Sequence, residues 1–274
     1  MQRLFEIRNS TDREYNSLKK LWSKCFDDSA DVIDNFFKKT VTPENTVSAF
    51  YNGEAVSALY IIESTIFFSG QNYPAFYIYA VCTDPDFRGQ GLMKKCFDFL
   101  FEEAKSREID YIFLVPASDS LFEMYKKLGF KTGFSYSQKI VNRACCDNKI
   151  TDIRKLCYND YVNIRKAFST EKPVAVLDEK GFNSFYSPVG ETIRAFKSGD
   201  GYAVYETENG AVTVHEIFGD EEILLQSVFE LSGSDCVVVR SFSDNNNNKI
   251  SGMYKTLGDV PELSNAFFGI PYGG

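Results

Sequence analysis

Two glycines, Gly89 and Gly91, stand between an apolar run and an amphipathic run, and this arrangement strongly limits the possible folds. Residues 75–83 have the composition of a strand, and residues 91–108 place apolar side chains at helical spacing. Glycines in a turn allow a ligand close to the backbone, and the first amides of a helix are unpaired donors at its positive end. The sequence therefore predicts a strand, an anion-binding turn and a helix in succession.

The usual nucleotide motifs do not fit this turn. In a P-loop, a lysine and a hydroxyl residue follow the second glycine, but here Leu92 and Met93 follow it. The dinucleotide fingerprint needs a third glycine where Lys94 stands, and the segments before the turn indicate an antiparallel meander. A diphosphate ligand is compatible with the turn, whereas the common nucleotide folds are not.

The segments around the turn predict one sheet covered by helices. Apolar periodicity predicts helices at 11–26 and 29–40, and Asn52 with Gly53 predicts a hairpin turn, followed by a second turn at 70–72. After the glycines we expect a buried strand at 111–117, a helix in which Ser120 and Glu123 form a capping box, a helix end at Gly129, and a closing strand at 130–140. The predicted fold class is α/β (α+β), with a mixed, mostly antiparallel central sheet flanked by helices.

The second half of the chain repeats part of this order without the glycines. Residues 142–149 are polar and lose periodicity, which predicts a boundary between a unit at 1–142 and a unit at 150–274. Beyond it the sequence predicts a helix within 159–168, a hairpin within 201–219, a helix within 220–232 and a strand within 236–240.

Composition restricts the class of protein. The 274 residues are 44% apolar, which is ample for a packed core, and the net charge of −8 disfavours nucleic acid and favours a cationic partner. No apolar stretch is long enough to span a membrane, and the first residues lack the apolar core of a secretion signal, so we expect a cytoplasmic protein that does not bind membranes. The seven cysteines form no CxxC pair, which predicts reduced thiols and no metal site.

Two motifs carry a resemblance to a known family. The stretch "YAVCTDPDFRGQGLMKK" resembles the acyl-CoA-binding signature of the GNAT superfamily of N-acetyltransferases. The stretch "LFEMYKKLGF" is similar to the second signature of that family, with Tyr125 four residues before Gly129. The resemblance covers residues 1–140 by order of elements. It departs from the family at Met93, where glycine or alanine is preferred, although Eis-type members also carry a bulkier residue there.

The resemblance implies a binding site for acetyl-CoA. The diphosphate is implied to lie on the amides of Arg88, Gly89, Gln90, Gly91, Leu92 and Met93. The strand at 79–83 is implied to offer backbone groups to the pantetheine arm through Val81, Cys82 and Thr83, in a slot where this strand splays from the next one. Ser118 stands where many members have an asparagine that contacts CoA. Ordinary strand packing for Val81 and Thr83, and helix capping for Ser118, are alternative interpretations.

The resemblance also gives a candidate for catalysis. Tyr125 matches the family tyrosine that protonates the departing thiolate as a general acid, and the alternative is a residue that only packs beneath the sheet. The general base is not identified: Glu63, Asp84 and Glu102 are carboxylates near the relevant segments, and proton transfer through water is also compatible. His215 is the single histidine, and a structural role is favoured for it over a catalytic one.

The sequence therefore resembles a two-domain, Eis-like GNAT protein that lacks the sterol-carrier-like third domain. This resemblance implies an acetyl-CoA-dependent N-acetyltransferase that uses direct attack in a ternary complex, with an acceptor amine on a small molecule or peptide that is expected to be cationic. Two alternatives stay open: a non-catalytic acyl-CoA-binding or regulatory protein, and a transferase of another acyl group. A homo-oligomer is left open, and the apolar tail at 267–272 is a candidate to close the acceptor pocket.

Overall fold

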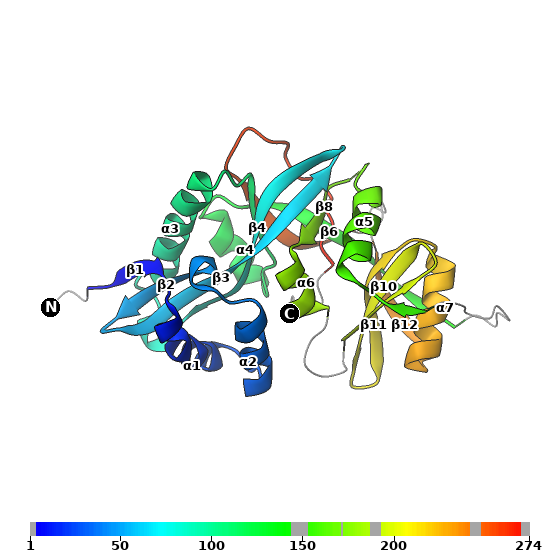
Figure 1. Cartoon of the computed structure of the whole chain (residues 1–274), viewed down its shortest axis with the longest axis horizontal. Coiled ribbons are helices and arrows are strands. Elements are labelled where there is room, and N and C mark those ends of the chain that lie inside the picture. The colour runs from blue at the N-terminus through cyan, green and yellow to red at the C-terminus, as the bar shows by residue number, and fades with distance from the viewer. Residues whose placement is uncertain (1–3, 144–152, 171, 187–192, 242–247, 270–274) are drawn as a thin grey trace.

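The structure, a computed structural model, describes residues 4–143, 153–170, 172–186, 193–241 and 248–269 (Figure 1). Their strands pair in the order β1-β2-β3-β4-β5-β13-β6-β12-β11-β10-β9-β7, and β8 pairs with β3. The parallel pairs in this order are β4 with β5 and β11 with β12. The strands are β1 (Glu6–Asn9), β2 (Thr46–Tyr51), β3 (Glu54–Phe68), β4 (Gln71–Thr83), β5 (Tyr111–Leu114), β6 (Lys131–Asn142), β7 (Arg154–Lys155), β8 (Val174–Leu177), β9 (Ile193–Ser198), β10 (Gly201–Glu208), β11 (Ala211–Phe218), β12 (Cys236–Ser241) and β13 (Lys249–Thr256).

Helices cover both faces of this sheet. They are α1 (Tyr15–Cys25), α2 (Ala30–Lys39), α3 (Leu92–Ser106), α4 (Asp119–Lys126), α5 (Tyr158–Phe168), α6 (Glu179–Phe185) and α7 (Glu221–Ser232), with short 3₁₀ turns η1 (Asp12–Glu14), η2 (Pro43–Asn45) and η3 (Pro85–Phe87). Figure 1 shows α1 and α2 on one side of β3, with α3 on the other. The predicted fold class, a mixed and mostly antiparallel sheet flanked by helices, is confirmed.

The apolar stripes of the helices explain which face each one covers. Trp22 of α1 is 1% exposed and its ring lies 5.1 Å from the rings of Phe36 and Tyr60, which joins α1, α2 and β3 in one core. On the opposite face, Leu100 of α3 and Ile112 of β5 belong to a second core. The cores form because each stripe recurs at helical spacing and removes apolar area from water.

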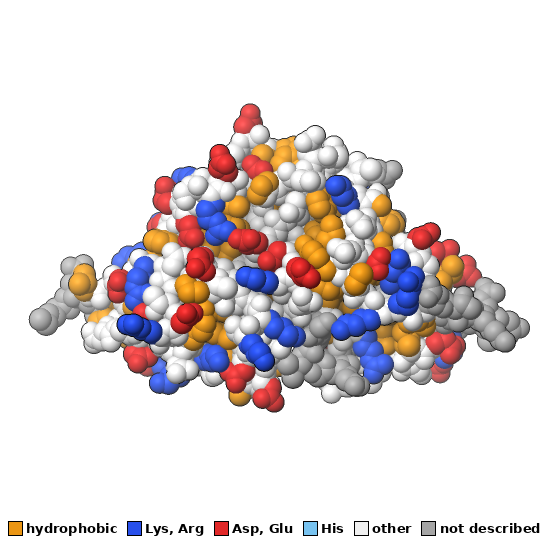
Figure 2. Space-filling view, in the orientation of Figure 1, with side chains coloured by type: hydrophobic (Ala, Val, Ile, Leu, Met, Phe, Trp, Pro, Cys, Tyr) orange, Lys and Arg blue, Asp and Glu red, His pale blue; other side chains and the backbone are white. Residues whose placement is uncertain are grey.

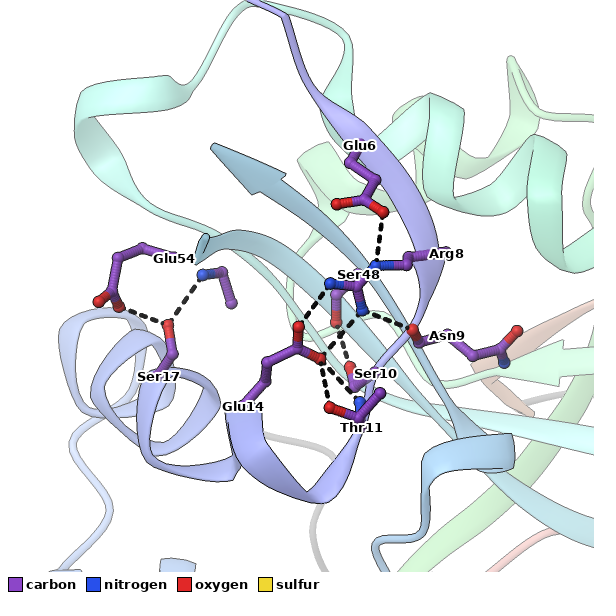
Figure 3. A network of polar contacts seen from close by, with 10 residues as sticks. Glu6, Arg8, Asn9, Ser10, Thr11, Glu14, Ser17, Ser48 and Glu54 are labelled. Carbon is purple, nitrogen blue, oxygen red and sulfur yellow. Dashed lines mark hydrogen bonds and ion pairs between the residues drawn. The ribbon is translucent and has the colours of Figure 1, made fainter. Parts of the chain in front are cut away.

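Polar contacts fix the first strand at the edge of the sheet (Figure 3). Arg8 of β1 forms ion pairs with Glu6 at 2.8 Å and with Glu14 at 2.5 Å, and Glu14 also accepts from the Thr11 amide at 2.7 Å. Next to it, Ser17 donates to Glu54 at 2.7 Å. These contacts tie β1 to the segment before α1, and α1 to β3.

Three strands from the second half of the chain pair with strands of the first half, and one of them is β12, which is antiparallel to β6. β13 lies between β5 and β6 and is antiparallel to both, and β8 pairs with β3. Part of the predicted boundary at 142–149 lies outside the described residues, so the division into units 1–142 and 150–274 stays a prediction. The pairing joins the two halves in one continuous sheet.

The apolar tail packs into the core as far as it is described. Phe267 and Phe268 are 2% and 5% exposed, and the Phe268 ring lies 4.7 Å from Tyr77 and 4.9 Å from Phe113. Residues 270–272, the end of the predicted tail segment, lie outside the described residues.

Two local predictions are wrong. The capping box at Ser120 and Glu123 does not form, because α4 begins two residues earlier, with Ser118 at its N-cap position. The second hairpin turn lies at Ser69 and Gly70, not at 70–72, because Gln71 already pairs with Phe68. Gly129, by contrast, has the left-handed φ of 88° expected of a helix end.

Surface charge, helix hydrophobicity and cysteine state were each the basis of a sequence prediction. In Figure 2, basic and acidic side chains are interspersed over the visible face. No helix among the described residues is long and apolar enough to cross a membrane. Cys25, Cys82, Cys96, Cys157 and Cys236, the cysteines within the described ranges, are free thiols.

Candidate functional site

The separation of two parallel strands creates the candidate site. β4 and β5 pair from Ala75 with Tyr111 to Ile78 with Leu114, and β4 then continues to Thr83 paired with β3 but not with β5. Ala80 has a positive φ of 47° where the pairing of β4 with β3 shifts register, which bends β4 at this point. The splay that the resemblance implied is therefore present, and it leaves a gap between the ends of the two strands.

The glycine turn places the start of α3 beside this gap. Gly89 and Gly91 have φ of 76° and 70°, in the left-handed region that favours glycine. Gly91 is the N-cap of α3, so no side chain there can bond the first amides of the helix. The amide of Lys95 donates to the Gly91 carbonyl at 3.1 Å, and the amides before it have no carbonyl one turn earlier in the helix. The turn thus presents free donors at a positive helix end.

Two hydrogen bonds and one ion pair hold the turn in place. Asp84 caps η3 by accepting from the Asp86 amide at 3.0 Å and pairs with Lys24 of α1 at 2.7 Å. Arg88 donates from Nε to the Thr83 carbonyl at 3.2 Å, which bends its side chain back over β4. The turn is therefore tied to both β4 and α1.

A cleft of about 540 Å³ follows the turn and the gap. Its lining includes nearly all the residues that the sequence predicts for the site, from three separate parts of the chain. They are Val81, Cys82 and Thr83 of β4, Arg88, Gly89, Gly91, Leu92 and Met93 of the turn and α3, and Ser118 and Tyr125 of the α4 segment. Gln90 is exposed in the same turn but is not among the lining residues.

Tyr125 lies in the wall of this cleft from α4. It is 5% exposed, and its ring packs at 5.8 Å from the rings of Phe97 and Phe130. Burial raises the pKa of the Tyr125 phenol above its ordinary value of 10.0. The phenol therefore stays protonated at neutral pH, which is the state a proton donor needs.

The hydroxyls of Thr83 and Ser118 have local partners. Thr83 Oγ1 lies 2.8 Å from Ser57 Oγ, so this side chain also holds β4 to β3. Ser118 occupies the N-cap position of α4, but its side chain makes no capping bond and its Oγ lies 3.0 Å from Ser120 Oγ. Ser118 therefore has the position of a helix cap, but not the side-chain hydrogen bond to the helix amides that capping requires.

Sequence reasoning missed part of the cleft wall. The missed residues are Cys25, Phe26, Phe87, Lys94, Ser120, Leu121 and Met124. Cys25 and Phe26 come from the end of α1, far before the turn in the sequence, and no motif marks them. Lys94 could have been found, because it stands three residues after Gly91 in the first turn of the helix, where a cation adds to the positive end.

The thiol of Cys25 also lies on this wall. Its Sγ donates to the Thr83 carbonyl at 3.5 Å. A hydrogen bond from Cys82, opposed by burial and assisted by the charge of Arg88, lowers the pKa of the Cys25 thiol from 9.0 to about 7. A thiol with a pKa of about 7 is half ionised near neutral pH. Since the thiolate is the reactive form of cysteine, Cys25 is expected to react readily there.

We expect iodoacetamide to modify Cys25 with a rate that rises through pH 7 and levels off above it. Mass mapping of the alkylated peptide against pH measures this midpoint, and Cys157, which is exposed, serves as the internal comparison. Acetyl-CoA should slow the modification, since Cys25 lines the cleft. A midpoint near pH 9 with no protection would show that the thiol is ordinary and lies outside the ligand's site.

The candidate bases do not lie in this cleft. Glu63 pairs with Arg107, and Glu102 pairs with Lys105 at 2.8 Å, both at the surface. Burial alone would raise the pKa of Asp84, but the hydrogen bonds from Lys24 and the Asp86 amide outweigh it and hold that pKa below its ordinary value. A carboxylate so stabilised is a weak proton acceptor.

Comparison with known proteins identifies the family of the first part of the chain. Residues 6–133 match the acetyltransferase (GNAT) domain family. Comparison with curated proteins finds no sequence match.

Solved structures resemble the fold over most of the chain. A GCN5-related N-acetyltransferase from Kribbella flavida is 15% identical with a TM-score of 0.73, over 93% of this chain and 71% of that one. A GCN5-related N-acetyltransferase from Anabaena variabilis is also 15% identical, with a TM-score of 0.71 over 93% and 73% of the two chains. Eis1 from Mycobacterium abscessus is 11% identical, with a TM-score of 0.65 over 93% and 74%. At such identities these likenesses show the fold alone, and it is residues 6–133 that match the GNAT acetyltransferase domain family.

Proposed function

We propose that the protein transfers an acetyl group from acetyl-CoA to an amine of a small molecule or peptide, by direct attack in a ternary complex. One observation carries the proposal: the uncapped start of α3 and the buried phenol of Tyr125 line the same cleft, at the point where β4 and β5 separate. Donors for a diphosphate and a proton donor would then lie along one ligand path. Family membership supports the acyl-transfer chemistry.

The cleft fits the shape of acetyl-CoA at the turn. A Cβ built on Gly89 or Gly91 meets no atom within 4 Å, so the backbone there borders open space that a diphosphate can enter. The amides of Leu92 and Met93 and the charges of Arg88 and Lys94 would hold the diphosphate. The backbone of Val81 and Thr83 would bind the pantetheine arm along β4, and Ser118 would contact it from the other wall.

The chemistry requires an amine without its proton and a proton for the departing thiolate. Tyr125 donates that proton as the C–S bond of the thioester breaks and the N–C bond of the amide forms. The amine loses its proton to water, because the three carboxylate candidates lie outside the cleft lining. The net charge of −8 favours an acceptor whose amine is cationic before it is deprotonated.

Replacing Gly91 with aspartate tests the binding part of the proposal. The new carboxylate would repel the diphosphate at the start of α3, and we expect the affinity for acetyl-CoA in calorimetry to fall by about 100-fold, the effect of about 2.7 kcal/mol. Gly91→Asn is the matched control, because asparagine has the same shape and also tolerates a positive φ but carries no charge. Its affinity should stay within about tenfold of wild type. Equal affinities for wild type and Gly91→Asp would remove the turn from the binding site.

Release of CoA with a panel of amines separates this proposal from its two alternatives. Amine-stimulated release from acetyl-CoA supports the transferase. Binding of acetyl-CoA with no release on any amine supports an acyl-CoA-binding or regulatory protein. Faster release from a longer acyl-CoA than from acetyl-CoA supports a transferase of another acyl group.

A further inference from the structure

A second cavity lies next to the cleft, and it holds an arginine. Its volume is about 180 Å³, slightly above the size of an engineered protein cavity that binds benzene. Its wall combines two kinds of side chain: apolar ones, from Val115, Pro116, Phe122, Ile250, Phe267 and Phe268, and polar ones, from Tyr136, His215, Arg240 and Ser251. It therefore suits a small molecule with an apolar body and one charged group.

The charged group of this cavity is held by a chain of hydrogen bonds. Arg240 Nη1 lies 3.2 Å from Nδ1 of His215, and Nε2 of His215 lies 3.0 Å from a carboxylate oxygen of Glu206. A guanidinium can only donate, so Nδ1 accepts and the proton of the neutral ring is on Nε2, from which it is donated to Glu206. Both ring nitrogens are thus occupied, and His215, 4% exposed, positions the guanidinium. This agrees with the structural role that was favoured for it.

The guanidinium of Arg240 has a hydrogen-bond donor without a partner in this cavity. Its Nε is buried and has no hydrogen-bond partner. Its guanidinium lies 5.1 Å from the centre of the Tyr136 ring, and within the described ranges no carboxylate forms an ion pair with it. A buried donor without a partner is costly, and guanidinium geometry matches a carboxylate through two parallel hydrogen bonds. Among the described residues the Nε of Arg240 therefore lacks a partner, and an anion would supply one.

The position of the cavity relates this anion to the acyl-transfer cleft. Val115 and Pro116 follow directly on β5, past the last residue that pairs with β4, and Ser118 of the cleft lies two residues further on. On α4, Phe122 lines the cavity and its neighbour Leu121 lines the cleft. The segment between β5 and α4 thus forms a wall common to both spaces, at the place where the strands separate.

We propose that this cavity binds the acceptor, and that the acceptor is a small amine that also carries a carboxylate, an amino acid with an apolar side chain. Arg240 would bind the carboxylate, and Val115, Phe122 and Phe268 would contact the side chain. The amine would then lie toward the gap between β4 and β5. The identity of the acceptor rests on the proposed function, whereas the carboxylate site stands on the cavity alone. The acceptor would then carry two charged groups: the cationic amine, which the net charge of the protein favours, and a carboxylate, which Arg240 would bind.

The test compares amines that differ only in the carboxylate. Release of CoA from acetyl-CoA is measured with L-leucine and isoamylamine, and with L-phenylalanine and phenethylamine. We expect kcat/KM to be about 100-fold higher for each amino acid than for its amine without the carboxylate. In Arg240→Gln this ratio should fall to within about threefold of unity, through a higher KM for the amino acids. Arg143→Gln, at an exposed ion pair with Glu230, is the matched control and should keep the wild-type ratio.

A binding measurement separates the two proposals. Calorimetry of the CoA-bound protein with N-acetyl-L-leucine and with N-isoamylacetamide reports the carboxylate site without turnover. Tighter binding of the carboxylate compound, lost in Arg240→Gln, supports the site even if no amine is acetylated, in which case the transferase proposal fails alone. Turnover of amines with no preference for a carboxylate, or a preference that Arg240→Gln retains, overturns the site. Faster turnover of phosphoethanolamine than of any amino acid also overturns it, in favour of a phosphate.

Discussion

Replacing Tyr125 with phenylalanine is expected to lower kcat for CoA release by about 10²-fold to 10⁴-fold, the usual contribution of a general acid. The change removes only the phenol oxygen, so the ring still packs against Phe97 and Phe130 and the fold is kept. Affinity for acetyl-CoA should change by less than about threefold, since a proton transferred in the reaction contributes to the rate and not to ground-state binding. Steady-state kinetics and calorimetry on the same preparation measure both quantities.

Tyr73→Phe is the matched control for this prediction. Tyr73 lies at the other end of β4, where its ring packs 5.7 Å from Tyr111, and it does not line the cleft. The same deletion of a hydroxyl there should leave kcat unchanged. If Tyr125→Phe keeps the wild-type kcat, then Tyr125 only packs beneath the sheet, as the alternative interpretation of the sequence had it.

Replacing Arg165 with methionine is expected to lower the free energy of unfolding by about 3–5 kcal/mol. Arg165 of α5 and Glu216 of β11 are both fully buried and form an ion pair at 2.5 Å. Arg165 also donates to the Tyr202 hydroxyl at 2.7 Å, and Tyr202 donates to Glu216 at 2.8 Å. Methionine fills much of the space but leaves the Glu216 carboxylate without its cation, and an unpaired buried charge is costly. Urea denaturation followed by the fluorescence of Trp22 measures the loss.

Two further variants show whether the buried charge is the cause. Arg165→Met combined with Glu216→Gln carries no buried charge and should recover at least about 1 kcal/mol of the loss. Arg143→Met breaks an exposed ion pair with Glu230 and should cost no more than about 1 kcal/mol. If the double variant is less stable than Arg165→Met, packing around the arginine is the larger contribution.

The parts of the site that the sequence predicted are those made by neighbouring residues. Gly89 and Gly91 fix a turn through their own φ angles, and Tyr125 stands in α4 four residues before Gly129, which follows the helix end, so local patterns suffice for them. The capping-box prediction failed because Ser120 and Glu123 fit the local pattern, whereas the helix starts at Asp119 with Ser118 as its N-cap.

The remaining parts depend on contacts between distant segments. Cys25 reaches the cleft because α1 packs on β3 and β4, and Arg240 meets Val115 because β12, β6, β13 and β5 are neighbours in the sheet. Strand order is set by which apolar faces fit together in the complete fold, and no spacing within one segment records it. Composition likewise gave the net charge but not the site of an unpaired guanidinium.

The place of β13 between β5 and β6 has a consequence for how the protein is made. Chains are synthesised from the N-terminus, so β5 and β6 leave the ribosome more than a hundred residues before the strand that joins them. Until residues 249–256 follow, both strands present unpaired edges, which are templates for wrong pairing and aggregation. The cleft and the Arg240 cavity share the wall that β13 supports, so a nascent or prematurely terminated chain would contain every residue of the acetyl-CoA signatures and still lack a finished sheet. Catalytic competence in this protein would therefore arise late in translation, and chaperones that protect exposed strand edges would act on it during that interval.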